Sequence, residues 1–276
     1  MLQPQGWRQK RPIMIRALFS AGTGMSAQQL NVDNIANNLA NANTTGFKSR
    51  QVQFEDLLYQ TVLQPGTSSG AQTVVPTGLQ LGLGARPASN EIIFTQGDFQ
   101  QTNNPLDLVI QGNGFFQIQM ATGQVAYTRA GSFHLDKNGN LVDLNGNALE
   151  PQITIPSNAQ AVTIAGDGTV SYTLPNQTAA QTAGQIQLAT FANPSGLNSI
   201  GSNDFLPTEA SGDAIVGNPG GTEGLGTLQQ GYLESSNVSV VNEFINLISS
   251  QRAYEANSKV VKAADEMYQD INNITQ

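Results

Sequence analysis

The segment NNLANANTTGFKSR, residues 37–50, marks the point where a helical pattern in the sequence gives way to strands and turns. Its first seven positions hold four asparagines, and the chain then reaches Thr44, Thr45 and Gly46. Threonine weakens a helix, and glycine readily adopts the left-handed conformation that ends one. We expect Gly46 and Phe47 to form a helix stop, with Phe47 folding back as the usual hydrophobic contact.

Upstream of this segment, apolar and small residues recur at spacings of three and four, which places them on one face of a helix. The series is interrupted at Gln29 and consists of Ile15, Leu18, Gly22, Met25, Val32, Ala36 and Leu39. A seam of roughly four heptads predicts a helix over residues 15–43 that packs against another helix.

The segment VSVVNEFINLISSQRAYEANSKVVKAADEMYQDINNI, residues 238–274, contains no Pro or Gly. It predicts one long helix, of ~55 Å at about 1.5 Å per residue. Its apolar positions change phase between residues 249 and 252, as at a break in heptad register. They are Val241, Ile245 and Ile248, followed by Ala253, Val260, Ala264, Met267, Ile271 and Ile274.

Between these two segments the pattern is that of strands and turns. Asn138-Gly139 and Asn145-Gly146 each predict a hairpin. Gly112-Asn113-Gly114 separates LDLVIQ from FFQIQM, and the alternating apolar residues of the two runs predict half-buried antiparallel strands. We therefore expect a β-rich body over about residues 90–230 and an α+β fold with long helices at both ends.

Residues 59–89 are rich in Gly, Ser, Thr and Gln. Their composition fits a flexible linker and fits equally an extended arm that lies along a neighbouring molecule. Alternation at Val74–Val75 and Leu79–Leu83 would allow the segment to pair with something.

Asparagines form a stripe beside the apolar face of the first helix, at Asn31, Asn34, Asn38 and Asn41. An ordinary solvated helix face would explain them, but such faces usually carry Lys and Glu, and Asp33 is the one charge between Leu30 and Asn43. Neutral amides tolerate dehydration better than charges and can bond across a helix contact. We expect a face that is dry in an assembly and wet in a single chain.

Two helices with such narrow seams should be marginal alone, and order would come when neighbouring copies cover both stripes. Identical contacts that do not close on themselves build a helical filament. The residues that we expect to contact other copies are Leu18, Met25, Val32, Asn34, Ile35, Asn38, Leu39 and Asn41 in the first helix and Val241, Ile245, Ile248, Val260, Met267 and Ile271 in the second.

The composition excludes several kinds of site. There are 12 Lys and Arg against 20 Asp and Glu, a formal charge of -8, so nucleic acid is not an expected partner. The chain has no Cys and a single His, His134, which excludes thiolate and multi-histidine metal sites. We expect no metal and no cofactor.

Catalysis is not expected either. Carboxylates such as Asp98, Asp107 and Asp167 stand in turn-like contexts where Asp is common for backbone reasons. DKNGN, residues 136–140, resembles a calcium loop in part, but its Gly falls early and no bidentate Glu follows, so a hairpin turn fits better. We predict that the chain is not an enzyme.

The amino terminus, MLQPQGWRQKRPI, lacks the continuous apolar region of a cleaved secretory signal. Because the helical pattern starts near a second methionine, Met14, residues 1–13 are expected to be a disordered extension. No run of 18 apolar residues occurs that would predict a membrane-spanning helix.

Three parts of the chain resemble the bacterial flagellar rod and hook proteins. SAGTGMSAQQLNVDNIANNLANANTTGFK, residues 20–48, resembles the family's amino-terminal signature, and GYLESSNVSVVNEFINLISSQRAYEANSKVVKAADEM, residues 231–267, resembles its carboxyl-terminal signature. LDLVIQGNGFFQI and YTRAGSFHLDKNGNLV are similar to its central β domain. FEDLLYQTVLQPGTSSGAQTVVPTGLQLGLGARP is most similar to the distal-rod members, whose extra segment matches about residues 59–76.

The resemblance implies a division of the chain. Residues 14–48 and 231–276 would supply helices to a coiled-coil-like inner domain of the D0 type. Residues 49–89 would be an extended connecting arm with the rod-specific segment 59–76, and residues 90–230 a central β-rich domain.

The resemblance also implies a function. The chain would be a structural subunit of the distal rod of the flagellar basal body, polymerising into a straight, rigid, hollow drive shaft that carries torque across the periplasm and outer membrane to the hook. The partners implied are other copies, the proximal rod proteins, the hook protein or hook-rod junction, the P-ring and L-ring proteins, and the type III export apparatus, which needs no cleaved signal.

Two alternatives stay open on the sequence. The nearest is a proximal rod or hook subunit of the same family, although hook proteins usually carry an additional outer domain for which 276 residues leave little room. The other is a periplasmic cell-wall hydrolase, which would release muropeptides from peptidoglycan.

Overall fold

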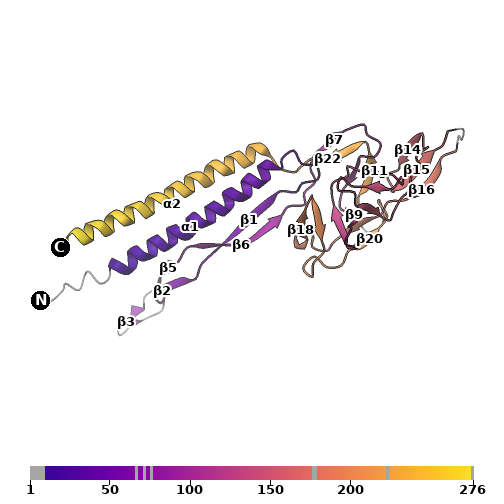
Figure 1. The fold of residues 1–276 in the computed structure, drawn as a ribbon. Helices are drawn as coiled ribbons and strands as arrows, with labels where there is room; N and C mark the ends of the chain where they lie inside the picture. Colours follow the sequence, from indigo (N-terminus) through magenta and orange to yellow (C-terminus); the bar gives the residue numbers. More distant parts are fainter. Residues whose placement is uncertain are drawn as a thin grey trace. The chain divides into compact units, whose positions relative to one another are not determined.

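The computed structural model describes residues 10–65, 68–70, 73–74, 77–175, 179–221 and 224–274 (Figure 1). The chain forms two compact units. The first, here called the helical unit, comprises Met1–Leu39, Arg50–Glu91 and Val240–Gln276. The second, the β unit, comprises Ala40–Ser49 and Ile92–Ser239. The fold is therefore α+β, as the sequence predicted.

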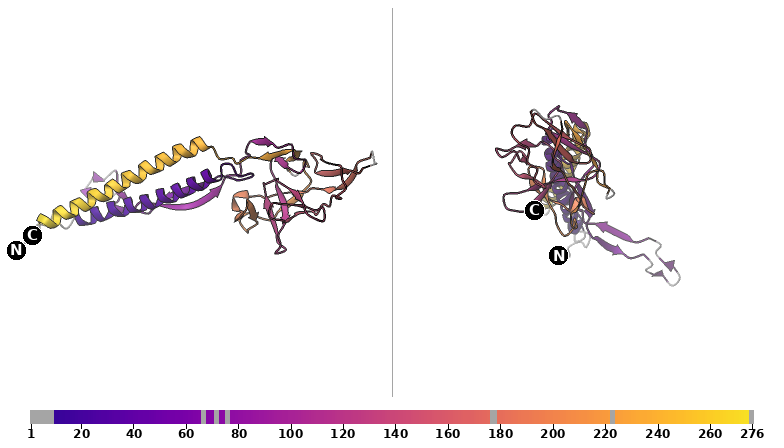
Figure 2. Two further views of the ribbon diagram at one scale, coloured as in Figure 1. Left: turned by 45° about the horizontal axis from the view of Figure 1, so that its top comes forward. Right: turned by 90° about the vertical axis from the view of Figure 1, so that its right-hand side faces the viewer.

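Two long helices dominate the helical unit, α1 (Lys10–Ala40) and α2 (Val240–Ile274). They lie side by side and antiparallel, which two views of the ribbon show (Figure 2). No helix in the described part of the chain is both long and apolar enough to cross a membrane.

The helix bounds differ from those that the sequence predicted. α1 begins at Lys10, so residues 10–13 are helical and not a disordered extension; residues 1–9 lie outside the described part of the chain. Pro12 is compatible with this start because it falls in the first turn, where a backbone N–H has no partner within the helix. α2 begins at Val240, two residues after the predicted start of the helical pattern, and within the predicted domain 231–276 residues 232–234 pair as a strand.

Among the residues that the structure describes, the helical unit also contains three two-stranded pairings. They are β1 (Arg50–Asp56) with β6 (Ala85–Ile92), β2 (Tyr59–Leu63) with β5 (Leu79–Gly82), and β3 (Ser68–Gly70) with β4 (Thr73–Val74). The segment that composition left open between linker and arm thus forms paired strands over much of its length.

The described part of the β unit contains a nine-stranded sheet, a three-stranded sheet and two two-stranded sheets. The sheet consists of β9 (Phe115–Gln119), β10 (Val125–Thr128), β11 (His134–Leu135), β12 (Leu141–Val142), β13 (Ala148–Glu150), β17 (Leu188–Thr190), β18 (Asn198–Gly201), β19 (Asp204–Leu206) and β20 (Ile215–Gly217). The smaller groups are β14 (Ala161–Ile164), β15 (Thr169–Thr173) and β16 (Gln181–Gln185); β8 (Leu108–Gln111) with β21 (Thr227–Gln230); and β7 (Phe99–Gln101) with β22 (Tyr232–Glu234). A 3-10 turn, η2, spans Pro194–Gly196.

Both predicted Asn-Gly hairpins are present, as β11–β12 and β12–β13. In each turn an aspartate accepts hydrogen bonds from the backbone. Asp136 Oδ1 accepts from the N–H groups of Asn138 (2.7 Å) and Asn140 (2.9 Å), and Asp143 Oδ1 accepts from the corresponding N–H groups of the second turn. These backbone bonds lower the pKa of Asp136 below its ordinary value. The DKNGN segment is thus a hairpin turn, and no cluster of metal-ligating side chains occurs among the described residues.

The prediction for residues 106–120 was wrong in two respects. β8 and β9 do not pair with each other. β8 pairs with β21, and β9 pairs with β10, β13 and β17. They are also buried on both faces and not half-buried. The reason is visible in the packing, because Phe116 faces one apolar cluster with Phe133 and Leu188, whereas its neighbour Phe115 faces a second with Phe191.

Asp204 on β19 is a buried carboxylate, 5% exposed. Burial, together with the negative charge of Asp143, raises the pKa of Asp204 to about 6. The folded chain therefore binds this proton more tightly than the unfolded chain. The resulting stabilisation is present in full below the ordinary pKa of 3.8 and is lost as the pH rises through about 6.

We predict that Asp204→Asn raises the free energy of unfolding of the β unit at pH 8 by about 2–3 kcal/mol, because the amide avoids the buried charge. The gain should shrink as the pH falls towards 4. Denaturant unfolding of the parent and variant across this range measures it. The exposed Asp213→Asn is the matched control, and a gain that does not depend on pH would contradict the assignment.

Candidate assembly surface

α1 and α2 meet through polar and small residues at a constant spacing. Asn38 Nδ2 donates to Glu243 Oε1 (3.2 Å), and Asn31 Nδ2 donates to Ser250 Oγ (2.8 Å). One heptad further along each helix, a Cβ added to Gly24 would lie 2.8 Å from the amide nitrogen of Asn257. We call this set the polar seam: Asn38, Asn31 and Gly24 on α1, with Glu243, Ser250 and Asn257 on α2.

The three contacts of the seam recur at every seventh residue of both helices, and they join polar and small side chains. Seven-residue spacing on both helices keeps one face of each against the other. Polar pairs in such a seam fix the register, while each hydrogen bond adds only about 0.5–1.5 kcal/mol net. The polar contacts therefore make the pairing within one chain specific, and the partly buried Leu247 and Val261 lie on the same side of α2 as the seam.

Two asparagines of the stripe also connect α1 to β1 through hydrogen bonds. Asn34 Nδ2 (2.7 Å) and Asn38 Nδ2 (2.9 Å) both donate to the carbonyl of Arg50, whose N–H donates to Asn38 Oδ1 (2.9 Å). The two side chains are 8% and 1% exposed. The expectation that this face is wet in a single chain was wrong for Asn34 and Asn38, because their partners come from the same chain. Asn41 is half-buried and accepts from Thr44 Oγ1 (3.2 Å).

Three apolar residues near the start of α2 lie on its other side. Val241, Ile245 and Ile248 lie about 140–200° around the helix from Glu243, on the side opposite the polar seam. They are 68%, 59% and 50% exposed. Further along, Val260 and Met267 are each 46% exposed, and the side chain of Ile271 lies outside the described part of the structure.

On α1 the predicted residues divide into two groups. Leu18, Met25, Val32 and Leu39 follow one another at seven-residue spacing, and all four are partly exposed. Ile35 is 3% exposed and so belongs to the interior of the helical unit.

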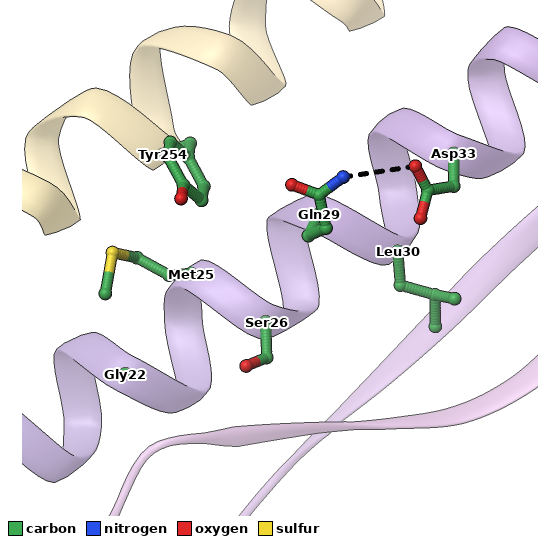
Figure 3. A pocket seen from close by; sticks show the side chains of 7 residues that line it. All are labelled: Gly22, Met25, Ser26, Gln29, Leu30, Asp33 and Tyr254. Atoms are coloured by element: carbon green, nitrogen blue, oxygen red, sulfur yellow. Dashed lines mark hydrogen bonds between the residues drawn. The ribbon is translucent and has the colours of Figure 1, made fainter.

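A shallow hollow of about 490 Å³ lies on the helical unit (Figure 3). Met25, Leu30 and Tyr254 give it apolar walls, and Gly22 leaves space beside them. Gln29 Nε2 donates to Asp33 Oδ1 (3.1 Å) at its polar end. It is an open recess with one carboxylate, so it is better suited to binding an apolar side chain than to catalysing a reaction.

The β2–β5 ribbon is exposed at every residue. Its large apolar side chains are Tyr59 (55% exposed), Val62 (54%), Leu63 (43%), Leu79 (52%) and Leu81 (36%). A single two-stranded ribbon is at best marginally stable in water, so a ribbon this apolar is typical of a surface that other protein covers.

Gly46 and Phe47 do not stop α1. The helix ends at Ala40, and a turn follows in which Phe47 N–H donates to the carbonyl of Thr44 (3.2 Å). Gly46 does take the expected left-handed conformation, with φ of 71°. Its role is close approach, because an added Cβ would lie 2.7 Å from the backbone nitrogen of Ala130.

Three family models match separate parts of the chain. Residues 18–48 match the family described as "Flagella basal body rod protein", residues 109–172 the "Flagellar hook protein FlgE/F/G D1 domain", and residues 229–274 the "Flagellar basal body rod FlgEFG protein C-terminal".

Full-length relatives give the decisive observation. The chain is 48% identical over 261 residues to the flagellar basal-body rod protein FlgG of Buchnera aphidicola subsp. Acyrthosiphon pisum, covering 95% of this chain and 100% of the relative. Identity to FlgG of Caulobacter vibrioides is 49% (92% and 97% covered), and to FlgG of Bacillus subtilis 40% (95% and 99% covered). The chain belongs to the FlgG family of flagellar basal-body rod proteins.

The basal-body rod family matches at residues 18–48 and 229–274 include both sides of the polar seam. Sequence reasoning identified the asparagines but missed their partners Glu243, Ser250 and Asn257. The available signal was the shared seven-residue spacing of polar and small residues on the two helices. Exposed Phe244 (47%) and Phe19 (56%) were also missed.

We predict that Asn38→Ala lowers the free energy of unfolding of the helical unit by about 1–3 kcal/mol, because the Arg50 N–H is left buried without its acceptor. Loss of helical circular dichroism on heating measures this. The exposed Asn43→Ala is the control, and equal melting of the two variants would contradict the buried role of Asn38.

Proposed function

We propose that this chain is a structural subunit of the distal flagellar rod, which polymerises into a straight, rigid, hollow shaft that transmits motor torque to the hook. Membership of the FlgG family supports a role in the basal-body rod. The observation that carries the proposal is the exposure of Val241, Ile245 and Ile248 on the side of α2 away from α1.

Covering these side chains would drive assembly. Full burial of one Val or Ile side chain is worth about 1.5–3 kcal/mol, so a contact repeated along a filament accumulates a large free energy. The partly exposed Leu18, Met25, Val32 and Leu39 of α1, with Val260, Met267 and Ile271 of α2, would extend the same contacts between copies. The helical parts of residues 14–48 and 231–276, which are α1 and α2, would then form a coiled-coil-like inner domain of the D0 type.

The exposed β2–β5 ribbon belongs to the same interface. The arm of residues 49–89, with its rod-specific segment 59–76, would lie on neighbouring subunits and stiffen the shaft against bending. Five large apolar side chains of the ribbon support this proposal, because all five are exposed in the single chain.

The remaining partners follow from the place of such a shaft. It would join the proximal rod proteins at one end and the hook protein or hook-rod junction at the other. It would pass through the P-ring and L-ring proteins on its way from the periplasm to the outer membrane. The flagellar type III apparatus would export it without a cleaved signal peptide.

We propose no catalytic function. Asp136 and Asp143 are engaged by backbone N–H groups. Residues 66–70, Gly-Thr-Ser-Ser-Gly, match the letters of a hydrolase nucleophile motif, but that motif requires a strand-to-helix turn, and Ser68–Gly70 is strand β3 paired with β4.

Ile245→Asp should raise the protein concentration needed for polymerisation by roughly 100-fold or more, because a carboxylate would be buried without a partner between subunits. Sedimentation and electron microscopy of the purified chain measure this, and the parent should form straight tubes. Gln251→Asp adds the same charge at an exposed polar position of α2 and is the matched control. Unimpaired assembly of Ile245→Asp, with melting of the β unit unchanged, would exclude this face.

A further inference from the structure

Three charged side chains meet inside the β unit: Lys48, Arg129 and Glu234. Lys48 and Glu234 are 0% and 1% exposed at the side chain, and Arg129 is 4% exposed. Lys48 Nζ lies 2.6 Å from Glu234 Oε1, and Arg129 Nη1 lies 3.3 Å from Glu234 Oε2. Charges so deeply buried are rare unless paired.

Glu234 is the centre of this cluster. Besides the two cations, its Oε1 accepts the N–H of Gly97 (2.9 Å), and its backbone carbonyl accepts the N–H of Gly46 (2.8 Å). Each carboxylate oxygen therefore has a charged donor. The site has two cations and one anion, and removing the anion leaves both cations buried without a counter-charge.

Carbonyl oxygens balance the excess positive charge in part. Lys48 Nζ donates to the carbonyl of Thr95 (2.7 Å), and Arg129 Nη2 donates to that of Gly112 (2.8 Å). The Arg129 guanidinium also stands 5.5 Å from the ring centre of Phe115. Burial still lowers the pKa of both Lys48 and Arg129, and the charge of Glu234 opposes that shift.

The cluster joins three chain segments that are far apart in sequence: residues 44–49, 92–98 and 232–237. Each lies next to a point where the chain passes from one unit to the other. They also bond directly to one another: Ser49 N–H to Asn237 Oδ1 (2.7 Å), Ile93 N–H to the carbonyl of Ser49 (2.9 Å) and Ser235 N–H to the carbonyl of Asp98 (2.8 Å).

We infer that Lys48, Arg129 and Glu234 form a charged clasp that makes the docking of these three segments onto the β unit mutually dependent. When residues 232–237 leave, Lys48 and Arg129 lose their common anion. When residues 44–49 leave, the Glu234 Oε1 atom loses its cation, and residues 92–98 lose the Ser49 carbonyl. The clasp opens as one step, and no single segment frays while the other two stay closed. This property belongs to the single chain and does not depend on polymerisation.

Hydrogen–deuterium exchange of the full chain tests the clasp through two variants. Lys48→Met keeps the length of the side chain and removes one cation. Glu234→Gln keeps the shape of the side chain and removes the anion. Arg86→Met is the matched control, because it breaks the Arg86–Glu55 pair (2.9 Å) whose side chains are 63% and 54% exposed.

In Lys48→Met, amide exchange should rise by roughly tenfold in residues 44–49 and equally in residues 92–98 and 232–237, while β9 stays protected. Glu234→Gln should raise it in the same three segments by roughly 100-fold, because two cations are left unpaired. Arg86→Met should change none of them.

A rise confined to residues 44–49 in Lys48→Met would overturn the clasp, since it would mean that each segment docks alone. A rise that spreads to β9 by the same factor would also overturn it, because that pattern reports global unfolding. If Glu234→Gln fails to fold, Lys48→Met decides the question by itself.

Discussion

The polar seam between α1 and α2 is the constraint on which the assembly surface depends. Hydrogen bonds from Asn38 to Glu243 and from Asn31 to Ser250 set the register of the two helices, and Gly24 allows Asn257 to approach. With the register fixed in this way, Val241, Ile245 and Ile248 lie on the side of α2 away from the seam and remain exposed in the single chain.

Different interactions stabilise the two units. The β unit is closed by apolar packing, with Phe115 and Phe116 of one strand serving two separate clusters. The helical unit has few fully buried large side chains among those described, and much of its order comes from hydrogen bonds such as those of Asn34 and Asn38 to Arg50. In a rod subunit built in this way, the β unit would be packed before assembly, and the helices would gain further contacts from other copies.

The sequence predicted the elements better than their partners. Apolar spacing and the absence of Pro and Gly were enough for α2, and Asn-Gly pairs were enough for two hairpins, because these signals are local. The burial of Asn34 and Asn38 and the role of Glu234 were not predictable, since they depend on partners up to 205 residues away. The end of α1 at Ala40 was not predicted, because the turn that follows is stabilised by a residue distant in sequence: Gly46 N–H donates to the carbonyl of Glu234.

We propose that the apolar face of α2, formed by Val241, Ile245 and Ile248, is open in one chain and covered by other copies in the polymer. Because the chain has no Cys, a single Val241→Cys substitution gives a unique reporter of access. Its thiol should react rapidly with a soluble reagent in dilute protein and slowly in the polymer, while the thiol of Ala264→Cys, at a position 1% exposed, should react slowly in both. A Val241→Cys thiol that is protected in the dilute chain, or that stays equally reactive in the polymer, would contradict the account.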